Sequence, residues 1–264
     1  MLAYALPADF CDDAFDISET TAQLCPDEFA IAMITCFGAE YLCAPTAEDL
    51  VRIEKQFRGV GFPGCIGAVD CAGWTWKNCP KALQGSFVGK DGKPTMRLEA
   101  ICDLDLWCWH LQFGFPGAMN DINILNASEH FNDFLAGAFP STIPSYTIAG
   151  QTFNWYYYLA DEIYPRWKMF IRPVQGVKTS LEKKFNEVQE GVRKYVERIF
   201  GVLFRQQKFL FVATELWSPA KMENIAKCCV ILHNMCVEAR REGYSGDGAR
   251  GLSFFFEDEE SDLT

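Results

Sequence analysis

Four carboxylates stand where their spacing and surroundings would let them bind metal ions. Asp70 and Asp161 each end an apolar run typical of a strand, Asp121 follows a Pro-Gly turn, and Glu197 lies within a long helical pattern. Mg²⁺ and Mn²⁺ prefer oxygen ligands, and two such ions about 4 Å apart can stabilise both the attacking and the leaving oxygen of a phosphodiester. The four acids are therefore candidates for a metal-dependent site that cuts nucleic acid.

Each acid also has a purely structural interpretation. Asp70 and Asp161 could be turn or cap residues at strand ends, and Asp121 could be the N-cap of the helix that follows it. Glu197 falls about 160° around its helix from Leu181 at 100° per residue, away from the middle of the apolar stripe, so it could face a groove or solvent. Arg193, four residues earlier, would suit it as a surface partner. Spacing alone leaves these alternatives open.

Cysteine and histidine do not provide a competing metal site. The twelve cysteines contain no Cys-x-x-Cys pair, and only three histidines are present (His110, His130 and His233). Zinc-ligand spacing is therefore absent, and free buried thiols in a reducing compartment are expected. His233 lies among helical apolar positions and is expected to be a structural residue.

The charge is distributed unevenly along the 264 residues. The net charge of -11 is unfavourable for phosphate binding, which depends on Lys and Arg. However, the acids concentrate in residues 1–50 and 247–264, which leaves a small basic excess in residues 51–246. No apolar run approaches the roughly 20 residues of a membrane-spanning helix, so no membrane association is expected.

Hydrophobic periodicity predicts strands followed by long helices. The expected strands lie near 65–70, 72–77, 95–103, 106–113, 156–161 and 169–171, with a polar loop at 85–94 and a connecting excursion at 137–154. The expected helices include a segment that begins after Ser18 and runs to Tyr41, one capped by Thr46, one opened by Asn120 or Asp121, one over 129–136, and two long ones over 179–204 and 219–240.

This order predicts one organised α/β domain with helical additions. Residues 1–60 form an acidic helical lead-in, residues 61–242 the main domain, and residues 243–264 an acidic tail expected to be disordered. Four lysines near Trp74 and Trp76 could line a DNA path with them, or the lysines could be solvated and the tryptophans could belong to the core (Lys77, Lys81, Lys90 and Lys93).

Five blocks of sequence together resemble the PIF/Harbinger-type DDE transposases and their host-domesticated nuclease relatives. They occur in the family's order over about residues 40–242, and they are GAVDCAGWTWKNCP (67–80), GAMNDIN (117–123), YYLADEIYP (157–165), QEGVRKYVERIFGVL (189–203) and ILHNM (231–235).

The resemblance implies an RNase H-like fold, a mixed sheet flanked by helices, and a DNA endonuclease or transposase. It implies Asp70, Asp121 and Glu197 as catalytic acids, with Asp161 as a further metal ligand, holding two divalent ions, Mg²⁺ or Mn²⁺. It also implies DNA such as transposon ends as substrate, a Myb-like DNA-binding partner protein, and a nuclear and also cytoplasmic location; a homo-oligomer is compatible with it.

Two positions beside the expected ligands depart from the family's pattern. Position 162 is Glu where similar relatives often have Gly, and position 195 is Tyr where Asp is common. The alternative hypothesis is therefore a catalytically inactive, domesticated transposase that acts as a DNA- or protein-interaction module.

Overall fold

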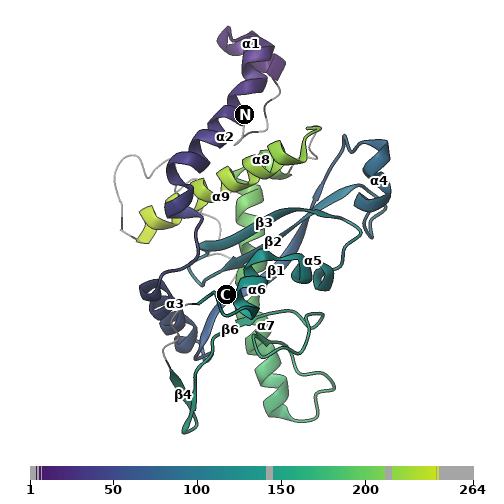
Figure 1. The fold of residues 1–264 in the computed structure, drawn as a ribbon. Helices are drawn as coiled ribbons and strands as arrows, with labels where there is room; N and C mark the ends of the chain where they lie inside the picture. Colours follow the sequence, from purple (N-terminus) through teal and green to yellow (C-terminus); the bar gives the residue numbers. More distant parts are fainter. Residues whose placement is uncertain are drawn as a thin grey trace, which may run out of the picture.

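In a computed structural model of the chain, residues 4, 6, 8–140, 145–211, 216–241 and 243 are described. Figure 1 shows a central sheet with helices packed around it. The helices are α1 (Ala8–Phe15), α2 (Glu19–Tyr41), α3 (Ala47–Gly59), α4 (Lys81–Phe87), α5 (Asp121–Ala127), α6 (Glu129–Leu135), α7 (Ser180–Gln206), α8 (Lys208–Phe211) and α9 (Pro219–Arg241). The strands are β1 (Cys65–Thr75), β2 (Thr95–Cys102), β3 (Cys108–Pro116), β4 (Tyr146–Ile148), β5 (Gln151–Phe153), β6 (Tyr157–Leu159) and β7 (Phe170–Ile171).

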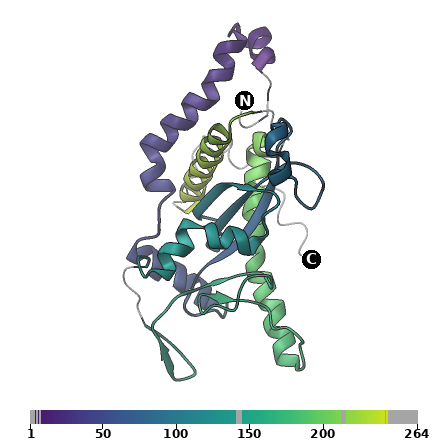
Figure 2. The same ribbon diagram turned by 45° about the vertical axis from the view of Figure 1, so that its right-hand side comes forward.

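The main sheet has five strands in the order β3-β2-β1-β6-β7. The first three strands are antiparallel neighbours, whereas β6 runs parallel to β1 and β7 runs parallel to β6. The sheet is therefore mixed, and helices lie on both of its sides (Figures 1 and 2). This confirms the expected α/β class and is consistent with an RNase H-like fold.

The central strand β1 is longer than the sequence pattern suggested. The two strands expected at 65–70 and 72–77 are one continuous strand, because β1 pairs with β2 without interruption from Ala68 to Thr75. The prediction that Asp70 ends a strand is therefore wrong: Asp70 lies in the middle of β1, opposite Ala100 of β2. The continuous pairing with β2 at this position leaves no turn role for the residue.

The helix α7 crosses one face of the sheet and packs on β1. It begins at a capping box in which the Thr179 hydroxyl accepts from the Glu182 N–H and the Glu182 carboxylate accepts from the Thr179 N–H. Further along, Gln189 is fully buried and donates to the carbonyl oxygens of Ala160 and Ile171, at 3.0 and 3.1 Å. The ends of β6 and β7 are thereby fixed to α7.

The helix α9 is clamped to the sheet by the His-Asn pair of the last sequence block. The His233 ring contacts the Leu106 carbonyl oxygen at 2.7 Å and the Gln206 side chain at 3.0 Å. Asn234 is fully buried and exchanges hydrogen bonds with both backbone groups of Cys108. The structural role expected of His233 is confirmed, and burial lowers its pKa to about 4.

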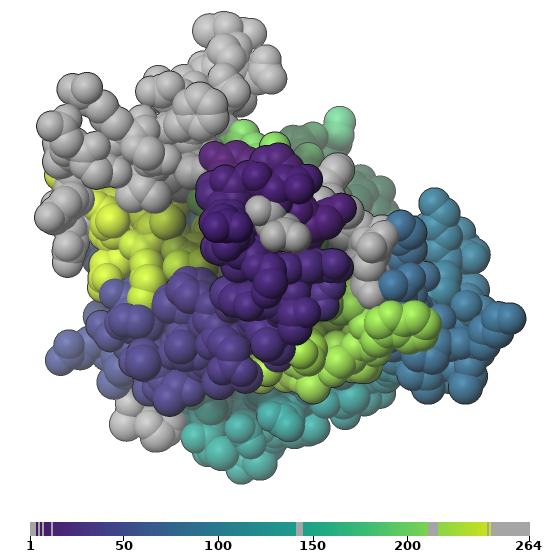
Figure 3. All heavy atoms as spheres, turned by 90° about the horizontal axis from the view of Figure 1, so that it is seen from above, coloured from purple at the N-terminus to yellow at the C-terminus, as the bar shows by residue number. Residues whose placement is uncertain are grey.

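The N-terminal helices cover α9. The helix α2 packs along α9, and in Figure 3 the N-terminal residues lie over the yellow-green C-terminal helices. The expected caps are confirmed, since Ser18 caps α2 and Thr46 forms a capping box with Asp49 at the start of α3. The boundaries proposed for the lead-in and the main domain stay predictions, and the acidic tail lies outside the described residues apart from Gly243.

Several short elements were not expected from the sequence. Part of the polar loop at 85–94 belongs to α4, the excursion at 137–154 contains the hairpin of β4 and β5, and α8 follows α7 directly. Short elements such as these carry too few residues for a periodic pattern to emerge. All twelve cysteines are free thiols. No helix within the described ranges is long and apolar enough to cross a membrane.

Candidate metal-binding carboxylate site

Asp70 projects from the middle of β1 toward α7. Its side chain is 19% exposed, and one carboxylate oxygen lies 3.7 Å from an Nη of Arg193. The other oxygen accepts from the N–H of Cys71 at 2.9 Å. Burial raises the pKa of Asp70 to about 6, although these two groups lower it, and the nearby charges of Glu197 and Asp121 raise it further. Asp70 is thus a carboxylate held in an environment that disfavours its charge.

Glu197 joins Asp70 through the same arginine. The second Nη of Arg193 lies 2.8 Å from a Glu197 carboxylate oxygen, and the Glu197 side chain is 45% exposed. The expected i-4 pair is therefore present, but Arg193 is only 12% exposed and contacts both acids. The pair is part of a three-residue cluster between β1 and α7, which we call the Asp70 cluster (Asp70, Arg193 and Glu197).

Asp161 follows β6, the parallel neighbour of β1. Ala68 pairs with Leu159, and Asp70 and Asp161 each lie two residues beyond this pair. Because β6 ends at Leu159, the pairing of the two strands does not extend to Asp161 itself. The Asp161 carboxylate accepts from the N–H of Glu162 at 2.7 Å. The sequence-based expectation that Asp161 directly ends a strand is close, since β6 stops at Leu159.

Asp121 approaches from the helices on the other side of the sheet. It is the first residue of α5, whose N-cap is Asn120, so the alternative of Asp121 as N-cap is wrong. Its carboxylate forms an ion pair with Arg97 of β2, and Arg97 also donates to the Met119 carbonyl oxygen at 3.0 Å. Asp121 therefore has a different arginine partner from Asp70, and its negative charge contributes to raising the pKa of Asp70.

The structure does not bring the four acids together into one closed metal site. Among the residues that the structure describes, no group of three His, Cys, Asp or Glu side chains is arranged to hold a metal ion. The structure brings Asp70 and Glu197 together through Arg193, and Asp161 follows the end of the neighbouring strand β6. It pairs Asp121 with Arg97. Their roles as ligands stay predictions.

A second buried carboxylate was missed by the sequence reasoning. Glu99 of β2, opposite Cys71, is fully buried, and its Oε2 accepts from the Ser128 hydroxyl at 2.5 Å. Its Oε1 has no hydrogen-bond partner among the described residues. Arg97 and Glu99 were both detectable as charged residues within an otherwise apolar strand pattern, which signals a polar partner from a helix.

Of the two interpretations of Trp74 and Trp76, the structure supports the one that places them in the core. Trp74 and Trp76 are 3% and 0% exposed and belong to the core, so they cannot stack on bases. The four lysines named with them are exposed around α4 and the following loop. Contact of these lysines with DNA phosphates stays a prediction, since such contact requires only an exposed positive charge.

Comparison with known proteins identifies the relatives of this chain. Residues 39–244 match the family described as "Plant transposon protein". The chain is 24% identical over 230 residues to "Putative nuclease HARBI1" of Bos taurus and 23% identical over 230 residues to the protein of that name in Homo sapiens. It is 25% identical over 195 residues to "Protein ALP1-like" of Arabidopsis thaliana. The resemblance seen in the five sequence blocks is confirmed.

These matches cover most of this chain but only part of the relatives. They span 86% of this chain and 61% of each of the two HARBI1 proteins, and 72% of this chain and 47% of the ALP1-like protein. No solved structure matches the chain.

Proposed function

The chain belongs to the plant transposon protein family, and from this membership we propose that it is a divalent-metal-dependent DNA endonuclease of the PIF/Harbinger type. The observation that carries the proposal is the Asp70 cluster: a mid-strand aspartate and a helix glutamate from distant sequence blocks share one cation, Arg193. No direct hydrogen bond between the two acids is found among the described residues, and Arg193 is what links them.

The carboxylates fit a Mg²⁺ or Mn²⁺ ion in their donor chemistry. Asp70 has one backbone hydrogen bond and one long arginine contact, so its carboxylate has capacity for a further cation. We propose that Asp70, Asp161 and Glu197 would hold the ions, which when bound would activate water and stabilise the leaving oxygen. Asp121, which is paired with Arg97, would be a further ligand.

This chain's own residues have separable tasks in that scheme. β1 fixes the Asp70 backbone, Gln189 holds α7 against the ends of β6 and β7, and Arg97 orients Asp121. The exposed lysines around α4 are suited to hold the phosphate backbone of DNA. A Myb-like partner protein and a nuclear location stay predictions that follow from the family.

The proposal predicts Mn²⁺-dependent nicking of DNA that carries terminal-repeat sequence. We expect D70A and E197Q to reduce the nicking rate at least about a hundredfold, because each removes a negative charge that would hold the divalent ions. E190Q is the matched control: Glu190 is exposed on α7 two turns before Glu197, and its removal should leave the rate unchanged. Rates are read from supercoiled plasmid converted to open circles.

The same assay ranks the two remaining aspartates. Since Asp161 follows the strand that pairs with β1, we expect a loss with D161N as large as with D70A. We expect a smaller loss with D121N, whose carboxylate is held by Arg97 of β2 and not by Arg193. Equal nicking by wild type, D70A and E197Q would assign any activity to a contaminant. No nicking by a wild-type protein that binds DNA would favour the non-catalytic interaction module instead.

A further inference from the structure

Arg193 is placed between two carboxylates in a way that differs from an ordinary surface ion pair. Its two Nη atoms address different acids, Glu197 at 2.8 Å and Asp70 at 3.7 Å. Its Nε is buried and has no hydrogen-bond partner among the described residues. The guanidinium thus contacts two separate acids, and its buried Nε–H donor makes no hydrogen bond within the described residues.

An internal comparison shows how an arginine of this fold binds a glutamate when nothing else competes. In α3, Arg58 forms a fork on Glu54, with Nε 3.1 Å and Nη2 2.8 Å from the same Oε1. Arg193 and Glu197 have the same four-residue spacing, but Arg193 gives up the fork to reach Asp70. Forked contacts are the stronger arrangement. Arg193 instead makes one close contact with Glu197 and directs its other Nη toward Asp70, so its position is shared between the two acids.

A divalent ion bound by Asp70 and Glu197 would need the same location. Both acids would have to turn their oxygens toward one point, and the guanidinium already lies where their charges converge. A guanidinium group and a metal ion cannot both fill the space between the same two carboxylates. The guanidinium and the metal ion therefore exclude each other at Asp70.

We propose that Arg193 is the resident counter-cation of this site and that a divalent metal ion binds Asp70 by displacing it. This inference rests on the proposed function. Arg193 thereby keeps two acids together in the metal-free protein and weakens the affinity for metal, so that the site is closed at low metal concentration and opens when metal is supplied.

The test measures Mn²⁺ binding to the full chain by the loss of the free Mn²⁺ signal in electron paramagnetic resonance. R193Q leaves a shorter but still polar side chain and removes the charge. We expect R193Q to bind Mn²⁺ roughly tenfold more tightly than wild type, because the ion no longer competes with a cation. R193K, whose shorter, single-point charge cannot reach both acids equally, should show a smaller gain.

Two controls isolate the displacement. R198Q removes an exposed arginine that lies over the Tyr195 ring one turn further along α7, and it should leave Mn²⁺ affinity at the wild-type value. Combining D70N with R193Q should abolish the gain, because the displaced contact is the one with Asp70. If R193Q does not fold, R193K alone decides the question, as any gain in affinity must then exceed that of R198Q.

The outcomes separate this inference from the proposed function. Mn²⁺ binding by wild type that D70N removes and R193Q leaves unchanged or weaker would overturn the inference and leave the nuclease proposal standing. An equal gain from R198Q would also overturn it, since general charge would then be the cause. Binding by R193Q but not by wild type would support it most strongly. Absence of binding in every variant would refute both.

Discussion

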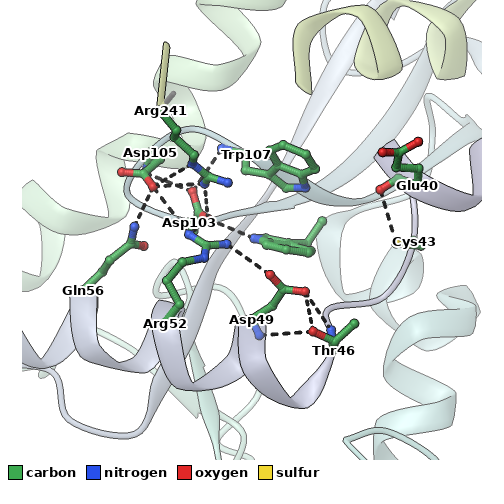
Figure 4. Close-up of polar contacts among 11 residues, drawn as sticks. Glu40, Cys43, Thr46, Asp49, Arg52, Gln56, Asp103, Asp105, Trp107 and Arg241 are labelled. Atoms are coloured by element: carbon green, nitrogen blue, oxygen red, sulfur yellow. Dashed lines mark hydrogen bonds and ion pairs between the residues drawn. The ribbon is translucent and has the colours of Figure 1, made fainter. Parts of the chain in front are cut away.

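Two clusters in which arginines contact an aspartate differ in how many donors surround that aspartate. One is centred on Asp103 and the other is the Asp70 cluster. The Asp103 cluster joins the turn between β2 and β3 to α3 and α9 (Figure 4), whereas the Asp70 cluster lies between β1 and α7. Asp103 is fully buried, while Asp70 is 19% exposed. Both carboxylates have a pKa raised by burial, so the difference between them lies in their partners.

Asp103 is surrounded by donors. Its Oδ1 accepts from the N–H groups of Asp105 and Trp107 at 2.9 and 3.0 Å. Its Oδ2 accepts from the Trp109 indole, from Arg241 at 3.0 Å and from Arg52 at 3.4 Å. Figure 4 shows the side chains of Arg52 and Arg241 directed toward Asp103. Every oxygen of this buried charge is satisfied, which is what a carboxylate with a structural role requires.

Asp70 lacks that enclosure. It has one backbone donor and one arginine at 3.7 Å, and that arginine is shared with Glu197. A buried charge with so few donors costs stability, and such residues concentrate at functional sites. Burial raises the pKa of both aspartates, and Asp70 differs from Asp103 in the number of carboxylate lone pairs that have no donor among the described residues.

The largest expected effect concerns Asp103. We predict that D103A lowers the free energy of unfolding by about 3 to 5 kcal/mol, because it leaves two arginines and an indole N–H without their buried acceptor. D105A is the matched control: it faces the same Arg52 and Arg241 but is 39% exposed, so its loss should stay within about 1 kcal/mol. Urea unfolding followed by circular dichroism measures both. Similar losses would show that Asp103 is not the centre of its cluster.

The second effect has the opposite sign and concerns Asp70. Its pKa of about 6 in the folded protein lies above the ordinary value of 3.8, so the folded state binds the proton more tightly than the unfolded state. The cost of the buried charge is fully present above about pH 6, shrinks as pH falls, and is gone below about pH 4. We predict that D70N is more stable than wild type at pH 8, by up to about 3 kcal/mol.

Urea unfolding at a series of pH values tests this sign. The advantage of D70N should diminish steadily between pH 7 and pH 4, since wild-type Asp70 becomes protonated over that range. A constant difference, or a D70N variant that is less stable at pH 8, would mean that the contact with Arg193 outweighs burial. Asp70 would then resemble Asp103, and the contrast between the clusters would fail.

The contrast also explains which features the sequence could predict. The longer strands of the main sheet, the long helices and the caps at Ser18 and Thr46 were predictable, because capping chemistry and hydrophobic periodicity are local. The position of Asp70 within β1 was not, because it depends on continuous pairing with β2. The candidate acids were named from the sequence blocks, and their roles as ligands stay predictions.

The partners of the acids were harder to predict than the acids. Arg193 was visible as an i-4 partner of Glu197, but its contact with Asp70 arises only when α7 packs on β1. The pairing of Arg97 with Asp121 likewise depends on how β2 and α5 meet. Such contacts are non-local, and no spacing along the chain encodes them. The same holds for Asp103, which looked like any polar residue at a strand end.

The smallest expected effect is the one that most sharpens the comparison. We predict that E197Q changes the free energy of unfolding by no more than about 0.5 kcal/mol, because Glu197 is 45% exposed and its ion pair is screened by solvent. A double-mutant cycle of R193Q and E197Q should give a coupling energy below about 1 kcal/mol. A coupling of about 3 kcal/mol, as expected for the arginines around Asp103, would instead make the Arg193–Glu197 pair a structural element. Since a pair that contributes so little to stability can be opened at small cost, weak coupling is the condition under which a metal ion could replace Arg193.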